Sequence, residues 1–219
     1  MKINFLGDSI TQGTGASSEE NRYVDLVGKM LDIEVRNYGV GGTRFARQKK
    51  LSHNASYDYD FQMRMKIMAQ MDGDADLVFV FGGTNDYGHG DAEIGNTNDN
   101  NPYTFYGAVN NVIDFLINQY GKEKICFLLP LPRYSQDELS ARNNAKTKLP
   151  LSGYVEILKN RLNYYDIKYI DLFNGFMPIP QINTGDKYTV DGLHPNDLGH
   201  KLIANKVVEY VKNNIHYLI

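Results

Sequence analysis

Three side chains able to carry nucleophilic chemistry lie in two short segments far apart in the sequence. Ser9 lies in Gly7-Asp8-Ser9-Ile10-Thr11, and both Asp191 and His194 lie in Asp191-Gly192-Leu193-His194-Pro195. A serine hydroxyl is a weak nucleophile until a base takes its proton, and histidine suits that role because its ordinary pKa is about 6.5. A carboxylate on the other ring nitrogen holds the required tautomer. The three residues therefore predict attack on an ester carbonyl by Ser9, with His194 as base and Asp191 as its orienting partner.

Two further segments carry groups that could bind a developing negative charge. They are Asn37-Tyr38-Gly39-Val40-Gly41-Gly42 and Gly83-Thr84-Asn85-Asp86. A tetrahedral oxyanion needs hydrogen-bond donors that are already in place. Glycines let backbone N–H groups approach a substrate closely, and an asparagine side chain offers a further N–H. Asp86 is instead expected to hold its own loop through hydrogen bonds.

Short apolar runs alternate with helical patterns along the chain, and these elements must position the four segments. The runs typical of strands are Lys2–Leu6, Ile33–Asn37, Asp76–Phe81, Glu123–Leu129 and Lys168–Phe173. Helices are predicted near Arg22–Leu31, Phe61–Met71, Val109–Tyr120, Leu151–Tyr165 and Asp197–Val211. This alternation predicts an α/β fold in which a parallel sheet is covered on both faces. No linker interrupts the pattern, so residues 1–219 are expected to form a single domain.

Three polar segments, Gly88–Pro102, Pro130–Leu149 and Asn174–Val190, have the composition of loops. In an open parallel sheet, the loops that follow the strands build the ligand crevice. The four chemically active segments also follow strands. We therefore expect all of them to meet at one edge of the sheet.

The four segments together resemble the GDSL esterase/lipase family, also called SGNH hydrolases, and the resemblance spans nearly the whole chain. It implies that Ser9 is the nucleophile and that Asp191 and His194 complete the catalytic set. It further implies an oxyanion hole formed by Ser9, Gly42 and Asn85. Ile10 stands where the family name has leucine, a minor apolar exchange. The implied fold is a flavodoxin-like three-layer sandwich with a five-stranded parallel sheet, and no metal or cofactor is implied.

Composition excludes several other classes of protein. The chain has 219 residues, of which 22% are charged and 42% hydrophobic, as in a globular domain. A net charge of −3 offers no basic field for nucleic acid. Cys126 is the one cysteine, so no internal disulfide can form. No apolar stretch reaches the length of a membrane span, and no signal peptide is recognised, so a cytoplasmic location is the expectation unless a leader has been removed.

Other conspicuous residues have simpler interpretations. His200 is expected to be a surface or packing residue, Cys126 to be inert packing, and the basic cluster Arg44–Lys50 to be a solvated face with contact to an anionic substrate as the alternative. His53 and His89 lie near several aspartates without a recognisable metal-ligand spacing. Some of the crevice tyrosines could stack on a sugar or aryl group. These tyrosines are Tyr87, Tyr103, Tyr106 and Tyr134.

Rival functions fit the sequence less well. The elbow Gly-x-Ser-x-Gly of another hydrolase class is absent, because Thr11 stands where its second glycine would be. The glycine-rich nucleotide-binding motifs are absent too. A flavodoxin-like FMN binder and a noncatalytic binding protein on an esterase scaffold remain alternatives.

The loops also bear on the substrate. Burial of an acyl chain gains about 0.8 kcal/mol per CH₂, so a lipase needs an apolar trough. The crevice loops are mostly polar, although Phe176, Met177 and Ile179 could form a small apolar wall. We therefore expect a small-molecule or saccharide ester as substrate, with acetylated carbohydrate favoured. A lysophospholipid, an aryl ester or a thioester is the alternative, and the oligomeric state is left open.

Overall fold

Strands and helices alternate along the chain in the computed structural model, which describes residues 1–50, 59–68, 71–139, 149–181 and 186–214. The strands are β1 (Lys2–Gly7), β2 (Glu34–Gly39), β3 (Leu77–Phe81), β4 (Ile125–Leu128) and β5 (Lys168–Ile170). The α-helices are α1 (Ser9–Gln12), α2 (Tyr23–Leu31), α3 (Phe61–Met68), α4 (Thr84–His89), α5 (Phe105–Tyr120), α6 (Leu151–Tyr165) and α7 (Asp197–Asn214). Two 3₁₀ turns, η1 (Glu19–Asn21) and η3 (Lys122–Lys124), precede α2 and β4.

The strands form one parallel sheet in the order β2-β1-β3-β4-β5. Its register places Gly7 at the end of β1 opposite Gly39 of β2 and opposite Phe81 of β3. Phe81 is in turn opposite Leu128 of β4. Four strands thus end level with one another, and the segments that follow them all begin at the same edge.

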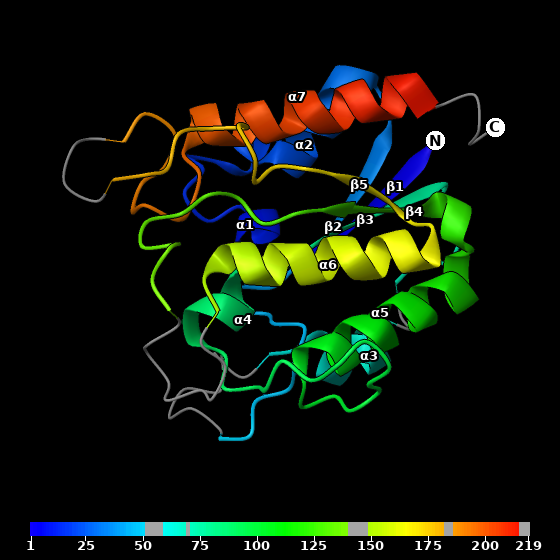
Figure 1. Ribbon diagram of the computed structural model, residues 1–219. Helices are drawn as coiled ribbons and strands as arrows, with labels where there is room; N and C mark the ends of the chain where they lie inside the picture. Colours follow the sequence, from blue (N-terminus) through cyan, green and yellow to red (C-terminus); the bar gives the residue numbers. More distant parts are fainter. Residues whose placement is uncertain (51–58, 69–70, 140–148, 182–185, 215–219) are drawn as a thin grey trace.

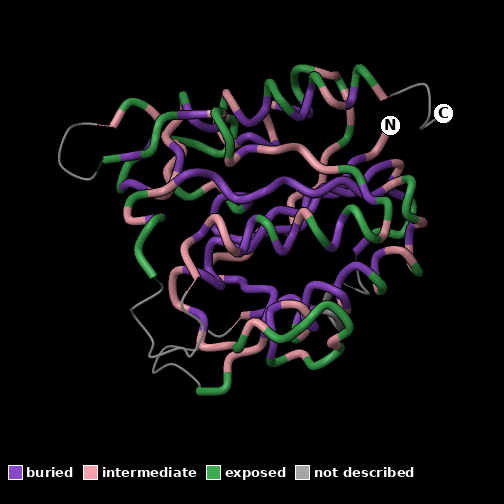
Figure 2. Tube along the Cα trace, viewed as in Figure 1, coloured by how far each residue is buried: buried purple, intermediate pink, exposed green. Residues whose placement is uncertain are grey.

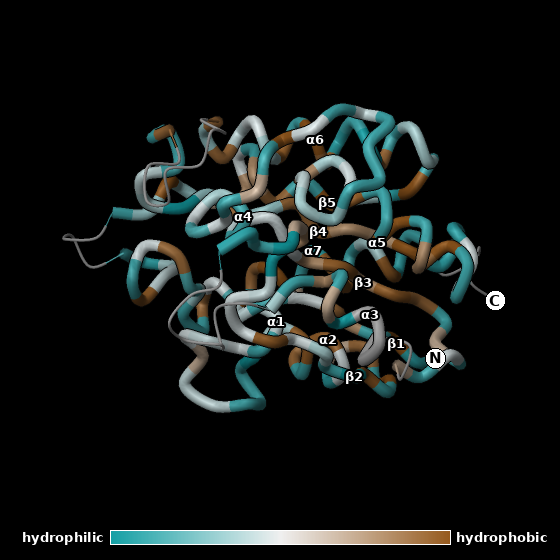
Figure 3. Tube along the Cα trace, turned by 90° about the horizontal axis from the view of Figure 1, so that it is seen from below, coloured by the Kyte–Doolittle hydropathy of each residue, from teal (hydrophilic) through white to brown (hydrophobic). Residues whose placement is uncertain are grey.

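Helices cover both faces of this sheet, with α2 and α7 on one side and α3, α5 and α6 on the other (Figure 1). The side chains of β3 show how the two cores are filled. Leu77, Phe79 and Phe81 pack toward α2 and α7, whereas Val78 and Val80 pack toward α5 and α6. All five residues of β3 are buried and apolar (Figures 2 and 3). A strand enclosed on both faces reads as a continuous apolar run, and the predicted flavodoxin-like sandwich is confirmed.

The boundaries of some elements differ from the prediction. Two short helices, α1 and α4, were not predicted because neither is long enough to show an apolar period. β4 begins two residues late because Lys122–Lys124 forms a 3₁₀ turn. β5 ends at Ile170 because the carboxylate of Asp171 accepts the backbone N–H groups of Phe173 and Asn174, which turns the chain.

His200 of α7 lies inside the core, which confirms packing rather than surface exposure. Its ring has no exposed area and stacks on Tyr23 of α2 with centroids 6.2 Å apart. Its Nδ1 accepts the backbone N–H of Tyr23 at 3.3 Å. Burial lowers the pKa of His200 to about 4, so the ring is neutral at ordinary pH.

This depressed pKa predicts a pH-dependent contribution to stability. Between about pH 4 and 6.5 the unfolded chain binds a proton at His200 that the folded chain does not, so the stability that this group confers is present above pH 6.5 and is lost as pH falls toward 4. The free energy of unfolding of the wild type minus that of His200→Gln should rise across this window by at most about 3 kcal/mol. Urea unfolding at several pH values measures it, and a difference that does not vary with pH would contradict the assignment.

Candidate active site

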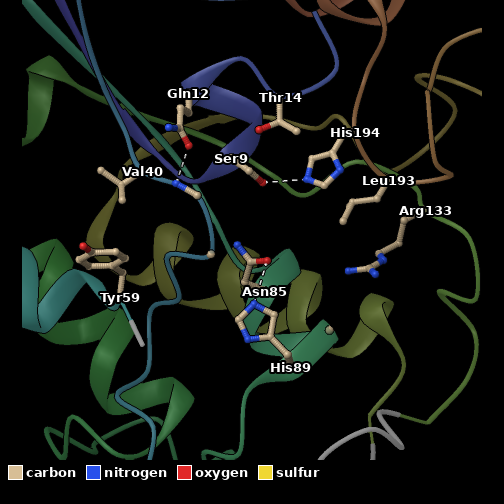
Figure 4. Close-up of a pocket in the computed structure, with 13 residues that line it drawn as sticks. Ser9, Gln12, Thr14, Val40, Tyr59, Asn85, His89, Arg133, Leu193 and His194 are labelled. Carbon is tan, nitrogen blue, oxygen red and sulfur yellow. Dashed lines mark hydrogen bonds between the residues drawn. The ribbon is translucent and has the colours of Figure 1, made fainter. Parts of the chain in front are cut away.

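A pocket of about 610 Å³ opens at the carboxyl edge of the sheet (Figure 4). Each of the four segments singled out in the sequence contributes to its wall. Ser9 follows β1, Gly41 and Gly42 follow β2, Asn85 lies on α4 after β3, and His194 lies just before α7. The lining residues are Ser9, Gln12, Thr14, Val40, Gly41, Gly42, Tyr59, Asn85, Gly88, His89, Arg133, Leu193 and His194.

Ser9, His194 and Asp191 form a continuous hydrogen-bonded row. Ser9 Oγ lies 3.0 Å from His194 Nε2, and His194 Nδ1 lies 2.6 Å from Asp191 Oδ2. A carboxylate only accepts hydrogen bonds, so Nδ1 carries the proton and Nε2 presents a lone pair to the serine hydroxyl. In Figure 4 the ring of His194 faces the Ser9 hydroxyl directly. The arrangement is able to remove a proton from Ser9 without any further rearrangement.

The Asp191–His194 pair is held by its own loop. Asp191 Oδ1 accepts the backbone N–H groups of Leu193 and His194 at 3.0 and 2.7 Å. Partial burial acts to raise the pKa of Asp191, but these N–H groups and the imidazole outweigh it and hold the pKa below its ordinary value. Asp191 is therefore ionised at neutral pH, as a partner for an imidazolium must be.

Ser9 is presented by the first turn of α1. Asp8 caps this helix by accepting the backbone N–H of Ile10 at 2.9 Å, and Gly13 ends it in the left-handed region. Gly39 lets β2 end against α1, because a Cβ at that position would lie 2.1 Å from the backbone nitrogen of Gln12. The tight fit leaves Ser9 buried in the wall with only 9% of its surface exposed.

Three N–H donors belong to residues that line the pocket. Gly42 has a φ of +75°, which favours glycine, and its backbone N–H donates to no other described residue. The same holds for the backbone N–H of Ser9 within the described part of the chain. Asn85 supplies a side-chain amide, whose Nδ2 lies 3.0 Å from the carbonyl oxygen of Thr43. The N–H of Gly41 is taken by Gln12 Oε1 at 2.8 Å, so Gly41 serves the turn.

Asp86 has the structural role expected from the sequence, but the loop that it holds is the one after β2 rather than its own. Its two carboxylate oxygens accept the backbone N–H groups of Phe45 and Ala46, each at 2.9 Å. Burial raises the pKa of Asp86 to about 7, and it likewise raises that of Asp8 to about 7. Both carboxyl groups lie beneath the pocket rather than in its wall.

The buried side chain of Arg64 also links several segments, and this role was not recognisable in the sequence. The side chain is 3% exposed and its guanidinium donates to the carbonyl oxygens of Gly7 and Tyr38 and to Thr43 Oγ1, at 3.0, 2.6 and 3.0 Å. It therefore joins the ends of β1 and β2 to the loop that carries Gly42. Burial lowers its pKa to about 10, which still leaves it protonated at neutral pH.

The segment after α1 also docks on the start of α7. Ser17 donates its backbone N–H and its hydroxyl to the carboxylate of Asp197, at 2.8 and 2.6 Å. Gly15 is close enough to Pro195 that a Cβ would lie 2.2 Å from the proline carbonyl oxygen. These contacts bring Ser9 and His194 together from segments 185 residues apart.

The basic cluster Arg44–Lys50 is not one solvated face, and that interpretation is wrong for Arg44. Arg44 has no exposed surface, and its Nη1 lies 3.0 Å from His89 Nδ1. Arg47 lies over the ring of Tyr103, and Lys49 pairs with Glu93 at 2.6 Å on the surface. The sequence could not separate these cases because burial depends on contacts with distant segments.

Other expectations meet with mixed results. Tyr59, which was not singled out, lines the pocket, whereas none of the four tyrosines that were singled out does so. The hydroxyl of Tyr87 is directed to the carbonyl oxygens of Ser135 and Glu138.

Cys126 is buried, and burial raises the pKa of its thiol. His53 lies outside the described residues, and within them no cluster of His, Cys, Asp or Glu is suited to a metal ion.

Phe176, Met177 and Ile179 do not form an apolar wall in the pocket. Met177 is buried and Phe176 packs against the core on the α2 and α7 side of the sheet, while Ile179 is exposed. Val40 and Leu193 are the aliphatic residues among those that line the pocket. Across the ranges that the structure describes, no helix is both long enough and apolar enough to cross a membrane.

Removal of the Arg64 guanidinium should destabilise the fold strongly. Arg64→Met removes three hydrogen bonds, although the Gly7 carbonyl oxygen keeps a second backbone donor, the N–H of Val40, and the expected cost is about 2–4 kcal/mol in the free energy of unfolding. Lys206→Met, on the exposed face of α7, is the matched control and should change it by about 0.5 kcal/mol or less. Urea unfolding measures both variants, and equal effects would show that Arg64 does not tie the strand ends.

Comparison with known proteins agrees with this geometry. The sequence matches the GDSL-like Lipase/Acylhydrolase family over residues 5–202. A solved structure from Lactobacillus plantarum is 27% identical, with a TM-score of 0.76 and coverage of 97% of this chain and 96% of that one. No match was found among curated proteins.

Two more distant structures share the fold. A lipase/acylhydrolase from Enterococcus faecalis is 20% identical, with a TM-score of 0.63 and coverage of 97% and 96% of the two chains. An acetyl xylan esterase is 23% identical, with a TM-score of 0.65 and coverage of 96% and 100%. Since the family match covers most of the sequence, the chain belongs to the GDSL-like lipase/acylhydrolase family and is a carboxylic ester hydrolase.

Proposed function

We propose that the protein hydrolyses short-chain acyl esters through an acyl-enzyme on Ser9. The observation that carries this proposal is the row of two hydrogen bonds from Ser9 to His194 and on to Asp191, at 3.0 and 2.6 Å, in the wall of the pocket. A nucleophile, a base and an orienting carboxylate in contact are the parts that acyl transfer to serine requires.

In the first step Ser9 Oγ attacks the ester carbonyl carbon while its proton passes to His194 Nε2. The imidazolium that forms is stabilised by the ionised Asp191, which stays unprotonated. The C–O bond to Ser9 forms as the carbonyl π electrons move onto the carbonyl oxygen. The product of this step is a tetrahedral intermediate with one negative oxygen.

That oxygen needs donors that are already in position, since donors that must reorient cost part of the stabilisation. The backbone N–H groups of Ser9 and Gly42 and the Nδ2 of Asn85 are assigned to this role. All three residues line the pocket, and the two backbone groups are held by α1 and by the loop after β2.

The intermediate collapses when the C–O bond to the alcohol breaks and His194 Nε2 gives its proton to the departing oxygen. A water molecule then repeats the sequence on the acyl-enzyme: His194 takes its proton, and the acid leaves as Ser9 regains a hydrogen. These steps use only protons and electron pairs that the substrate, water and the three side chains supply.

The pocket favours a small acyl group and a polar leaving group. Val40 and Leu193 are the aliphatic side chains in its wall, and Gln12, Thr14 and Arg133 are polar residues among the others that line it. An acyl chain of eight or more carbons would gain about 0.8 kcal/mol for each CH₂ only where apolar walls enclose it. The polar groups of Gln12, Thr14 and Arg133 suit a hydroxyl-rich alcohol such as a sugar, so an O-acetylated carbohydrate is the proposed natural substrate.

Replacement of the nucleophile tests the reaction itself. Ser9→Ala should lower kcat for a p-nitrophenyl ester by about 10⁴- to 10⁶-fold without unfolding the protein. Ser18→Ala changes an exposed serine whose side chain makes no capping hydrogen bond, and it should leave turnover unchanged. A fluorophosphonate should label Ser9 in the wild type. Labelling of a different serine, or near-normal turnover by Ser9→Ala, would contradict the proposal.

A series of acyl-chain lengths tests the substrate class. We expect kcat/KM for p-nitrophenyl esters from C2 to C12 to peak between C2 and C4, because Val40 and Leu193 are the two aliphatic side chains among the described residues of the wall and two are too few to enclose a longer chain. Release of acetate from acetylated saccharides by the wild type, and not by Ser9→Ala, would support a sugar as the alcohol. A steady rise of kcat/KM toward C8 or beyond would instead indicate a lipid substrate.

A further inference from the structure

A row of polar side chains runs from the buried Arg44 to the Asn85 amide beside Ser9. Arg44 Nη1 lies 3.0 Å from His89 Nδ1, and His89 Nε2 lies 3.2 Å from Asn85 Oδ1. Figure 4 shows the His89 ring below Asn85, with a ring nitrogen directed at the amide, while His194 lies on the far side of Asn85. The second hydrogen bond joins two residues four apart on α4, a spacing that places both on one helix face.

The chemistry of arginine decides the protonation of His89. A guanidinium carries five N–H donors and no acceptor, so the ring nitrogen that faces it must accept. Nδ1 of His89 therefore holds a lone pair, and the single ring proton of the neutral imidazole lies on Nε2. This proton is donated to Asn85, whose Oδ1 is the acceptor.

The orientation of the Asn85 amide follows from the same argument. With Oδ1 engaged by His89, the amide nitrogen faces the opposite way, toward the carbonyl oxygen of Thr43 at 3.0 Å and the carboxyl of Asp8 at 3.4 Å. A carbonyl oxygen can only accept, so Thr43 demands the same orientation. An amide turned by 180° would present its oxygen, rather than an N–H, to a developing oxyanion.

Arg44 is well placed to act as the fixed end of this row. Its backbone N–H donates to Tyr59 at 3.0 Å and its carbonyl accepts from Phe61 at 2.8 Å, so the residue is held on both sides. Burial raises the pKa values of Asp60 and Asp86, and the positive charge of Arg44 opposes this rise. The Arg44 guanidinium, which donates to His89, is therefore held in a fixed position inside the protein.

We propose that Arg44 and His89 are positioning residues that lock the Asn85 amide with its N–H side toward the oxyanion of the Ser9 reaction. This proposal rests on the proposed function and adds two residues to it. Neither residue needs to touch the reacting atoms. Their effect is to prevent rotation of the amide, which belongs to the preorganisation on which electrostatic stabilisation depends.

Steady-state kinetics of two His89 variants test the lock. His89→Leu removes both the acceptor and the donor and should lower kcat about 10-fold, with KM changed by about twofold or less, because misorientation affects the transition state more than substrate binding. His89→Gln keeps one acceptor and one donor and should recover most of that loss. An equal loss in the two variants would overturn the proposal, as would a rise in KM with kcat unchanged, which would indicate direct contact with substrate.

A double-mutant cycle with Asn85→Ala separates orientation from general stability. Asn85→Ala alone should lower kcat about 10²- to 10³-fold. In the Asn85→Ala background, His89→Leu should lower kcat by about twofold at most, because no amide remains to be oriented. A full 10-fold loss in both backgrounds would show that His89 acts independently of Asn85 and would overturn the lock.

The role of Arg44 is tested by the tautomer that it imposes. Long-range ¹H–¹⁵N spectra of the folded wild type should show His89 neutral, with the proton on Nε2 and an unprotonated Nδ1. A proton on Nδ1 would overturn the assignment.

These outcomes are distinct from a failure of the proposed function. Normal turnover by Ser9→Ala would remove the acyl-enzyme, and normal turnover by Asn85→Ala would remove the oxyanion role of that amide. A large loss in both of these variants, together with wild-type kcat in His89→Leu, would leave the proposed function intact and overturn the lock alone.

Discussion

The parallel register of the sheet is the constraint from which the site follows. Because Gly7, Gly39 and Phe81 lie opposite one another at the ends of their strands, the segments that follow them leave the sheet at the same level. A parallel sheet must be covered on both faces, which sends the chain through a helix after each strand and returns it to the opposite edge. Each return brings another polar segment to the same place. The pocket is therefore a product of topology, and its chemistry is a product of the residues placed there.

Beneath the pocket lies a layer of buried polar groups that fixes these segments relative to one another. Asp86 accepts hydrogen bonds from two backbone N–H groups, and Arg64 donates to three acceptors in three different segments. A buried charge loses the free energy of its hydration. Burial accordingly raises the pKa values of Asp8 and Asp86 and opposes their ionisation. An apolar layer would pack at lower cost, but it would not hold backbone groups at defined angles around Ser9.

The sequence allowed prediction of the five strands and of the parts of the site that lie in short, ordered motifs. Ser9, Asn85, Asp191 and His194 were recognisable because each lies in a segment whose residue types serve one chemistry. Arg44 and Arg64 were not recognisable, since an arginine that will be buried looks the same in sequence as one that stays in water. Its burial is decided by partners such as His89 or Tyr38, far away along the chain. The i, i+4 spacing of Asn85 and His89 was a usable signal, but α4 itself is too short to show a helical period.

The separation of Ser9 and His194 along the chain has a consequence for how activity arises during biosynthesis. To close a flexible loop of 185 residues costs about 5 kcal/mol of chain entropy, far more than one hydrogen bond returns. Docking of Ser17 on Asp197 and packing of α2 against α7 supply further contacts that offset this cost and hold the two segments together. A nascent chain on the ribosome that carries Ser9 but has not yet added His194 lacks the base of the proposed reaction. On the proposed mechanism, hydrolysis of an ester therefore has to wait until the last segment of the site has been synthesised and has reached Ser9.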